Sequence, residues 1–271
     1  MKNIELLNLL DMRELFAIYK KSIDSFVNIK IGFDEKIYIL LSEHIPERID
    51  GRFVNTIANS NYSAIILDVD WYENKVTGHT FVNLGKHKMN FHMIQSIGEN
   101  ILLLGARCKY NRENGPERNA VIVDLKGNVI NEFCFGDGKV KWEANREICD
   151  CYAINIDEQD NLWYYYYTEF ELVKTDLCKE KAYNPQVKGA AGFLITSDTR
   201  NVIFDGGYGK HDEFVTATFN GDALKDYEPI QLLHNGKNIK NKFYSFMQSK
   251  AVFIDVNCRL FVKWFISLGS I

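Results

Sequence analysis

The chain has 271 residues, a formal net charge of −4, and a composition that is 46% hydrophobic and 25% charged. These values are typical of an ordinary soluble protein, and no apolar run approaches the ~20 residues that a membrane-spanning helix requires. The acidic balance excludes the clustered basic face that neutralises nucleic-acid phosphates, so we expect neither nucleic acid nor a membrane as a partner.

The N-terminal segment and the cysteines bound the cellular location. Met1 to Asp24 lacks a basic region followed by an unbroken apolar stretch and a cleavage site, so we expect no signal peptide and a cytoplasmic location. Six cysteines in a chain of this length do not make a disulfide scaffold. Cys149 and Cys151 are the only close pair, and no second Cys or His pair has zinc-ligand spacing. The sequence therefore predicts no metal site and no cofactor.

One pattern recurs along the chain: a short apolar segment, a turn of Asp, Asn or Gly, and a second apolar segment. Each copy, which we name an apolar hairpin, predicts two antiparallel strands. In chain order the copies are FVNIKIGFDEKIYILL from Phe26, FHMIQSIGENILLLGA from Phe91, CYAINIDEQDNLWYYYY from Cys151, AGFLITSDTRNVIFDG from Ala191 and KAVFIDVNCRLFVKW from Lys250.

A second, more polar hairpin stands between successive copies of the first. Its copies are SAIILDVDWYENKVTGHTFV from Ser63, NAVIVDLKGNVINEFCF from Asn119, FELVKTDLCKEKAY from Phe170 and EFVTATFNGDALKDY from Glu213. Two hairpins in succession make a four-stranded antiparallel sheet, which is the blade of a β-propeller. The sequence therefore predicts an all-β fold in which residues 1–271 form a single propeller domain, most simply with five blades.

The last blade is incomplete in this scheme. Its missing strands come either from FISLGSI at the C-terminus or from residues 1–25, where NIELLNLLDMRELFAIYKK fits a short helix and ELFAIY also fits an outer strand. Four or six blades, or a β-sandwich or other all-β arrangement, remain open.

The hairpin order, with Ile-x-Ile-Asp, then Asn-x-Trp, then ELVKTD, resembles the NHL and YVTN class of propeller repeats. The stretch ILLLGARC, then NGPERNAVIVDLKGNVI, then FGDG, is also similar to a group of uncharacterised bacterial propeller proteins. This resemblance covers residues 91–170 and rests on turn residues. It implies that the apolar hairpin forms the inner two strands of each blade. It implies no reaction, because one fold hosts many activities.

A ligand site is expected on one face of the propeller. The loops between the second and third strands of each blade, and those between blades, lie together around the channel mouth, and loops on a rigid scaffold carry binding function. The candidate side chains, which combine arginine forks with acidic groups and a tyrosine, are Arg107, Glu117, Arg118, Asp137, Asp150, Tyr167 and Glu169. Salt bridges that anchor loops are the alternative role for the charged ones.

The remaining motifs favour structure over chemistry. GGYG from Gly206 predicts a turn, because no helix follows it to make a phosphate cradle. The WYYYY run from Trp163 predicts a strand covered on both sides, with only the end at Tyr167 and Glu169 reaching the loop face.

The function that follows is a non-catalytic module that binds a protein or a small ligand through its loop face. The alternative is a metal-dependent hydrolase, lactonase-like or esterase-like, with a cation in the channel. The inner strands do not favour a cation site, because no carboxylate recurs on them and their polar residues are Asn28, His92, Gln95 and Asn155. We therefore predict no catalytic residue.

Overall fold

The described residues of the computed structural model form two compact units. Unit 1 comprises residues 1–10 and 141–271, and unit 2 comprises residues 11–140. Within them the structure describes residues 1–21, 25–44, 47–49, 52–54, 60–87, 91–105, 120–133, 151–166, 169–176 and 179–265. We describe each unit by itself, so the single domain stays a prediction.

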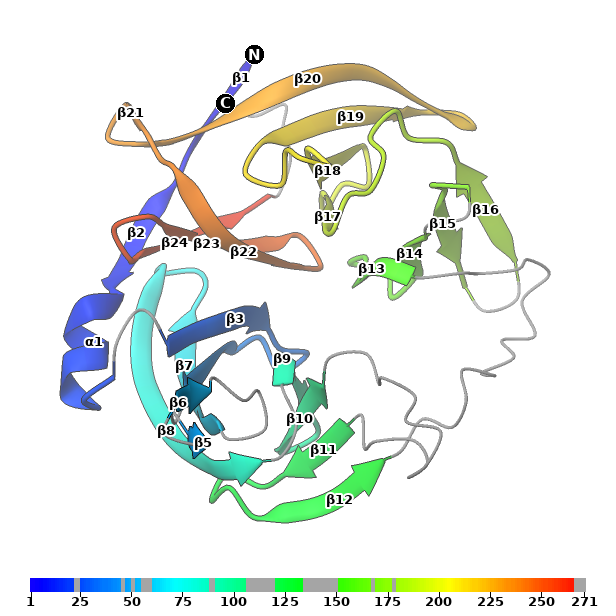
Figure 1. The fold of residues 1–271 in the computed structure, drawn as a ribbon. Coiled ribbons are helices and arrows are strands. Elements are labelled where there is room, and N and C mark those ends of the chain that lie inside the picture. Colours follow the sequence, from blue (N-terminus) through cyan, green and yellow to red (C-terminus); the bar gives the residue numbers. More distant parts are fainter. Residues whose placement is uncertain are drawn as a thin grey trace. The chain divides into compact units, whose positions relative to one another are not determined.

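The fold is all-β, and five four-stranded antiparallel blades make a five-bladed β-propeller; the short strands β1 (Lys2–Glu5) and β21 (Lys237–Asn238) extend the sheet of one blade. Figure 1 labels the strands. The five blades confirm the predicted fold class and blade number. Apart from one strand of the fifth blade, the strands of each blade follow one another in chain order. Two successive hairpins produce this order, because antiparallel neighbours can be joined by short turns.

Unit 2 holds the first two blades. Their apolar side chains pack in one cluster that includes Tyr38 and Leu40 of the first blade and Phe91 and Leu103 of the second. The first blade consists of β3 (Phe26–Ile31), β4 (Ile37–His44), β7 (Ser60–Asp70) and β8 (Lys75–His87), and the second of β9 (Phe91–Ile97), β10 (Asn100–Gly105), β11 (Ala120–Val123) and β12 (Val129–Phe133). A separate small hairpin joins β5 (Glu47–Ile49) to β6 (Arg52–Val54).

Unit 1 holds the other three blades, and contacts among β13, β17 and β22 bring their innermost strands together. The third blade consists of β13 (Cys151–Ile156), β14 (Leu162–Tyr166), β15 (Leu172–Thr175) and β16 (Glu180–Tyr183), the fourth of β17 (Phe193–Ile195), β18 (Asn201–Asp205), β19 (Phe214–Asn220) and β20 (Ala223–His234), and the fifth of β22 (Asn241–Met247), β23 (Lys250–Asp255), β24 (Arg259–Trp264) and β2 (Leu7–Asp11). The short strand β21 (Lys237–Asn238) pairs with β20.

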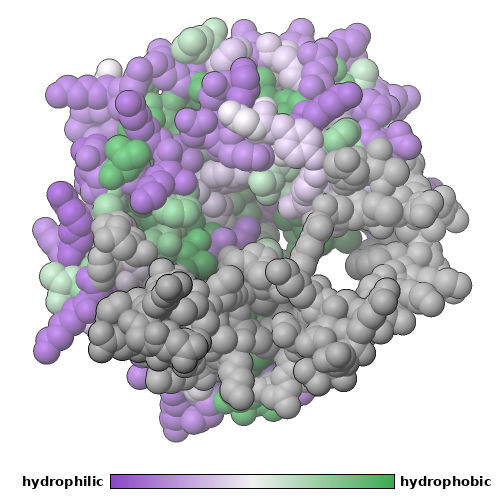
Figure 2. All heavy atoms as spheres, viewed as in Figure 1, coloured by the Kyte–Doolittle hydropathy of each residue, from purple (hydrophilic) through white to green (hydrophobic). Residues whose placement is uncertain are grey.

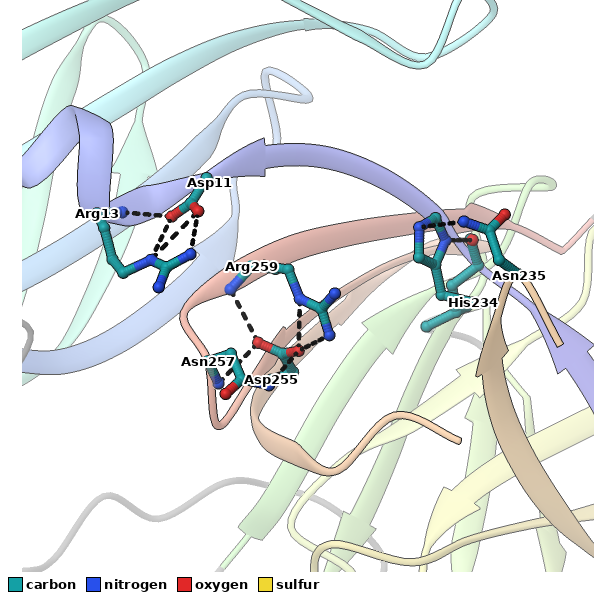
Figure 3. Close-up of polar contacts among 8 residues, drawn as sticks. Asp11, Arg13, His234, Asn235, Asp255, Asn257 and Arg259 are labelled. Carbon is teal, nitrogen blue, oxygen red and sulfur yellow. Dashed lines mark hydrogen bonds and ion pairs between the residues drawn. The ribbon is translucent and has the colours of Figure 1, made fainter. Parts of the chain in front are cut away.

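The N-terminal segment completes the fifth blade, as one of the two predicted options required. Strand β2 pairs with β24, while β1 (Lys2–Glu5) adds to the edge of β20 in parallel. Between them, the buried Leu6 donates its N–H to Leu233 O at 2.8 Å and accepts from His234 Nδ1 at 3.0 Å. Figure 3 shows His234 between this contact and Asn235. The N-terminal strands are therefore part of the core of unit 1.

The outer-strand reading of ELFAIY was wrong, because these residues lie largely in helix α1 (Met12–Ile18). Asp11 caps this helix by accepting the Arg13 N–H at 3.0 Å, and its carboxylate also binds the Arg13 guanidinium (Figure 3). A carboxylate at this position satisfies a donor that has no partner within the helix. The FISLGSI option falls mainly outside the described residues, which end at Phe265.

The fifth apolar hairpin was assigned to the wrong strands. We expected KAVFIDVNCRLFVKW to form the inner pair, but the inner strand is β22, so this hairpin supplies the second and third strands, β23 and β24. Its turn at Asp255 matches the inner turn at Asp157. In both turns, the carboxylate accepts hydrogen bonds from the N–H groups two and four residues later, and the residue three positions after the aspartate has a positive φ. Figure 3 shows the Asp255 turn with Arg259 also bound to the carboxylate. The local turn therefore does not encode its place in the blade.

The tyrosine strand β14 is core, as predicted. Trp163 and Tyr165 belong to one apolar cluster, and Tyr164 and Tyr166 belong to another, so successive side chains face opposite sides of the sheet. All four are at most 7% exposed. Each polar tip has a partner: Trp163 donates to Asp157 at 2.8 Å, and the three tyrosine hydroxyls donate to Glu180, Val187 O and Glu171.

Candidate ligand-binding site

The loop between β18 and β19, Gly206 to Glu213, is fixed by several backbone hydrogen bonds. Gly206 N bonds to Glu213 O, Tyr208 N to Lys188 O, and Lys210 N to Gly207 O, at 2.8 to 3.0 Å. Gly207 has φ +76, and a Cβ there would lie 2.2 Å from the Lys188 carbonyl oxygen, so only glycine fits. The predicted turn at GGYG is confirmed, and it is a rigid one.

Asp205, at the end of β18, fixes this loop through hydrogen bonds to its backbone and to His211. Its carboxylate is fully buried and accepts four hydrogen bonds, from the N–H groups of Ala191 and Gly207 at 2.8 Å, from the Tyr244 hydroxyl, and from His211 Nδ1 at 3.2 Å. Burial, and then the neighbouring carboxylate, raise the pKa of Tyr244, so its hydroxyl stays protonated and donates. The buried charge is thus fully compensated.

This arrangement decides the tautomer of His211. An ionised carboxylate only accepts hydrogen bonds, so the Asp205 contact places the proton of neutral His211 on Nδ1 and leaves a lone pair on Nε2. The His211 side chain is 48% exposed. In the neutral form of His211 the loop therefore presents an oriented hydrogen-bond acceptor at the surface.

The same loop presents Tyr208, which is 54% exposed. Its ring lies directly over Gly189, where a Cβ would meet three ring carbons at 2.6 Å. Two further rings stand perpendicular to it, those of Tyr152 and Phe170, with centroids 6.2 and 6.0 Å away, and its hydroxyl bonds to that of Tyr152. We name these three residues, Tyr152, Phe170 and Tyr208, the aromatic platform.

Phe170 reaches the platform at a cost in backbone strain. Its φ is +54, a conformation that bulky residues rarely adopt and that concentrates at functional sites. The Lys188 ammonium lies 5.8 Å from the centroid of its ring, a cation–π contact. All residues of the platform and of the Asp205 network lie in unit 1.

Of the seven predicted site residues, the structure describes only Glu169. It is exposed in the turn between β14 and β15, directly before Phe170 in the chain. The other predicted positions lie outside the described residues: Arg107, Glu117, Arg118, Asp137, Asp150 and Tyr167. Sequence reasoning missed Tyr208 and His211, although three glycines around one tyrosine in GGYG were a usable sign of a presented aromatic ring.

Asn155 of the inner strand β13 is structural. It is 1% exposed, its amide donates to Phe193 O and Gln248 O, and its carbonyl accepts from Gln248 N and Ile156 N. These bonds join the third, fourth and fifth blades within unit 1. Asn155 therefore has no capacity left for a channel ligand.

The described residues offer neither a cluster of metal ligands nor a membrane-spanning helix. No group of three or more His, Cys, Asp or Glu side chains is placed to hold a metal ion in that part of the chain. No described helix is long and apolar enough to cross a membrane. On the face that Figure 2 shows, the described surface is mainly hydrophilic, with small separate hydrophobic areas.

No family model and no curated protein matches the sequence. The NHL and YVTN assignment therefore stays a prediction. Among solved structures, the chain is similar to one in a mitotic checkpoint complex, with 5% identity, coverage of 97% of this chain and 94% of that one, and a TM-score of 0.44. It is also similar to virginiamycin B lyase from Staphylococcus aureus, with 12% identity, coverage of 96% of this chain and 97% of that one, and a TM-score of 0.38. A luciferin-regenerating enzyme is similar with 11% identity, coverage of 89% of this chain and 76% of that one, and a TM-score of 0.33. At these values the likeness carries no statement about activity, ligand or partner.

Proposed function

We propose that the chain is a binding module and that its ligand site is the aromatic platform. The observation that carries this proposal is the support of Tyr208: a ring held at its backbone, at one face and at its hydroxyl, yet more than half exposed. A side chain that is already ordered loses little entropy when a ligand binds, and such rigid aromatic anchors dominate binding energy in known interfaces.

The polar groups around the platform support the same reading. His211 contributes an acceptor oriented by Asp205, and Glu169 and Lys188 are exposed on the two neighbouring loops. A few oriented polar groups beside aromatic surface are typical of ligand sites. We keep the cytoplasmic location, the bacterial character, the absence of a nucleic-acid or membrane partner and the six predicted residues outside the described chain as predictions.

The proposal can be tested by 19F NMR on protein carrying 3-fluorotyrosine at its 14 tyrosines. Tyr208→Phe and Tyr72→Phe assign two signals; Tyr72, 84% exposed in the turn between β7 and β8 of unit 2, is the control. The titrated library contains basic, acidic and neutral peptides, neutral oligosaccharides, nucleotides and ammonium compounds. We expect at least one class to shift the Tyr208 signal saturably without shifting that of Tyr72. If no class shifts the Tyr208 signal, or every shift is shared with Tyr72, the proposal is wrong.

A further inference from the structure

We infer that the aromatic platform binds an arginine side chain of a partner peptide. This inference rests on the proposed function and names the ligand class. Gly189 lies against one face of the Tyr208 ring, and the residue is 54% exposed. A planar guanidinium stacks on such a ring through cation–π and π contacts, and arginine makes this contact more often than lysine.

Two polar residues on the loops of the platform, His211 and Glu169, can accept hydrogen bonds. In its neutral form, His211 bonded to Asp205 through Nδ1 carries a lone pair on Nε2, and the exposed Glu169 carboxylate accepts hydrogen bonds. A guanidinium is the complementary group, since it carries five N–H donors and no acceptor. A neutral sugar needs hydrogen-bond donors as well as acceptors from the protein. The Lys188 ammonium is such a donor, but it is already engaged over the Phe170 ring.

The charges of these loops favour a cation. The described parts of the loops before β15, between β16 and β17 and between β18 and β19, residues 169–171, 184–192 and 206–213, hold four acidic residues and two lysines: Glu169, Glu171, Asp212, Glu213, Lys188 and Lys210. Lys210 and Glu213 pair with each other at 3.5 Å, and Glu171 accepts from Tyr166. The surplus is therefore negative, which disfavours a phosphate or carboxylate ligand and attracts a basic one. The Lys188 contact with Phe170 shows the same attraction within the chain.

The test uses three short peptides that differ at one position: Ac-Gly-Gly-Xaa-Gly-Gly-amide with arginine, lysine or citrulline at Xaa. Citrulline keeps the shape of arginine but replaces the guanidinium with a neutral urea. We expect the arginine peptide to bind about fivefold to tenfold more tightly than the citrulline peptide, measured by titration of the Tyr208 19F signal, with lysine in between. Raising the salt concentration should reduce this ratio.

Variants locate the contact. Tyr208→Ala and Glu169→Gln should each weaken binding of the arginine peptide, read from backbone amide shifts, whereas Tyr72→Ala should leave it unchanged. Thermal unfolding of each variant checks that the fold is intact. Equal binding of the arginine and citrulline peptides, or unchanged binding by Tyr208→Ala, overturns the inference. A saturable Tyr208 shift with another class of compound but not with arginine would leave the proposed function standing and exclude this ligand class.

Discussion

Two segments of unit 1 that carry tyrosine show how differently the same residue type can be used. In strand β14, Tyr164, Tyr165 and Tyr166 are at most 7% exposed. In the loop after β18, Tyr208 is 54% exposed. Both segments satisfy the hydroxyl groups with protein partners, so the polar tip does not distinguish them.

The difference lies in the backbone on which the rings stand. A strand places successive side chains on opposite faces of a sheet, and neighbouring structure covers both faces of β14. The GGYG segment bonds its backbone to Lys188, Glu213 and Asp205 and keeps Gly207 close against Lys188, while its one side chain, that of Tyr208, stays more than half exposed. Tyrosine supplies stability in the first setting and a contact surface in the second.

The largest expected difference is in the effect of removing each ring. Tyr165→Ala should lower the free energy of unfolding by about 3–5 kcal/mol, because it empties a fully buried site. Tyr208→Ala should cost less than about 1 kcal/mol, because the residue is more than half exposed. Urea unfolding of the two variants measures both values. Comparable losses would mean that Tyr208 is a structural residue and would remove the contrast.

A smaller difference is expected between two glycines of the GGYG loop. Both Gly207 and Gly209 have φ +76, so an alanine at either costs about 1–2 kcal/mol in backbone strain. At Gly207 the added Cβ also meets the Lys188 carbonyl oxygen at 2.2 Å, whereas nothing lies within 4 Å at Gly209. Gly207→Ala should therefore destabilise more than Gly209→Ala and shift the Tyr208 19F signal. Equal effects on stability would show that the loop is not held against Lys188.

The smallest effect concerns pH and the polar contact at the start of β14. Burial opposes ionisation of Asp157, but hydrogen bonds from Trp163, Asn161 and Gln159 outweigh it and hold the pKa of this carboxyl below its usual value. Its stabilisation is therefore complete above the ordinary value of ~3.9 and is lost as the pH falls through the lower folded value. Asp157→Asn should destabilise the protein at pH 7, and its difference from the wild type should shrink as the pH falls below ~3.9, measured by urea unfolding. A difference independent of pH would contradict this assignment.

Much of the fold could be predicted from the sequence because the signals are local. Apolar runs with turn residues located the hairpins of the first four blades, and the alternation of Trp163, Tyr164, Tyr165 and Tyr166 predicted a strand buried on both sides. The error in the fifth blade has a physical cause. The turns at Asp157 and Asp255 share their hydrogen bonds, yet one joins the first and second strands of a blade and the other joins the second and third.

The candidate site was less predictable. Glu169 was predicted as a site residue, but its role in the candidate site depends on the contact between the rings of Phe170 and Tyr208, which belongs to the next blade. Likewise, no residue near His211 in the sequence predicts that Asp205 is buried and accepts hydrogen bonds from Tyr244 and Ala191. The sequence therefore does not predict that Asp205 sets the tautomer of neutral His211. Such contacts join segments far apart in the chain, and a local pattern carries no information about them.

The sequence by itself therefore determined the all-β class, the blade repeat and the buried character of the tyrosine strand, because hydrophobic periodicity and turn chemistry act between near neighbours. Only the tertiary structure decided that the N-terminal strands complete the fifth blade and that GGYG presents an aromatic ring beside an oriented histidine. Both depend on pairing and packing between distant segments, whose free energy is gained only when the blades come together.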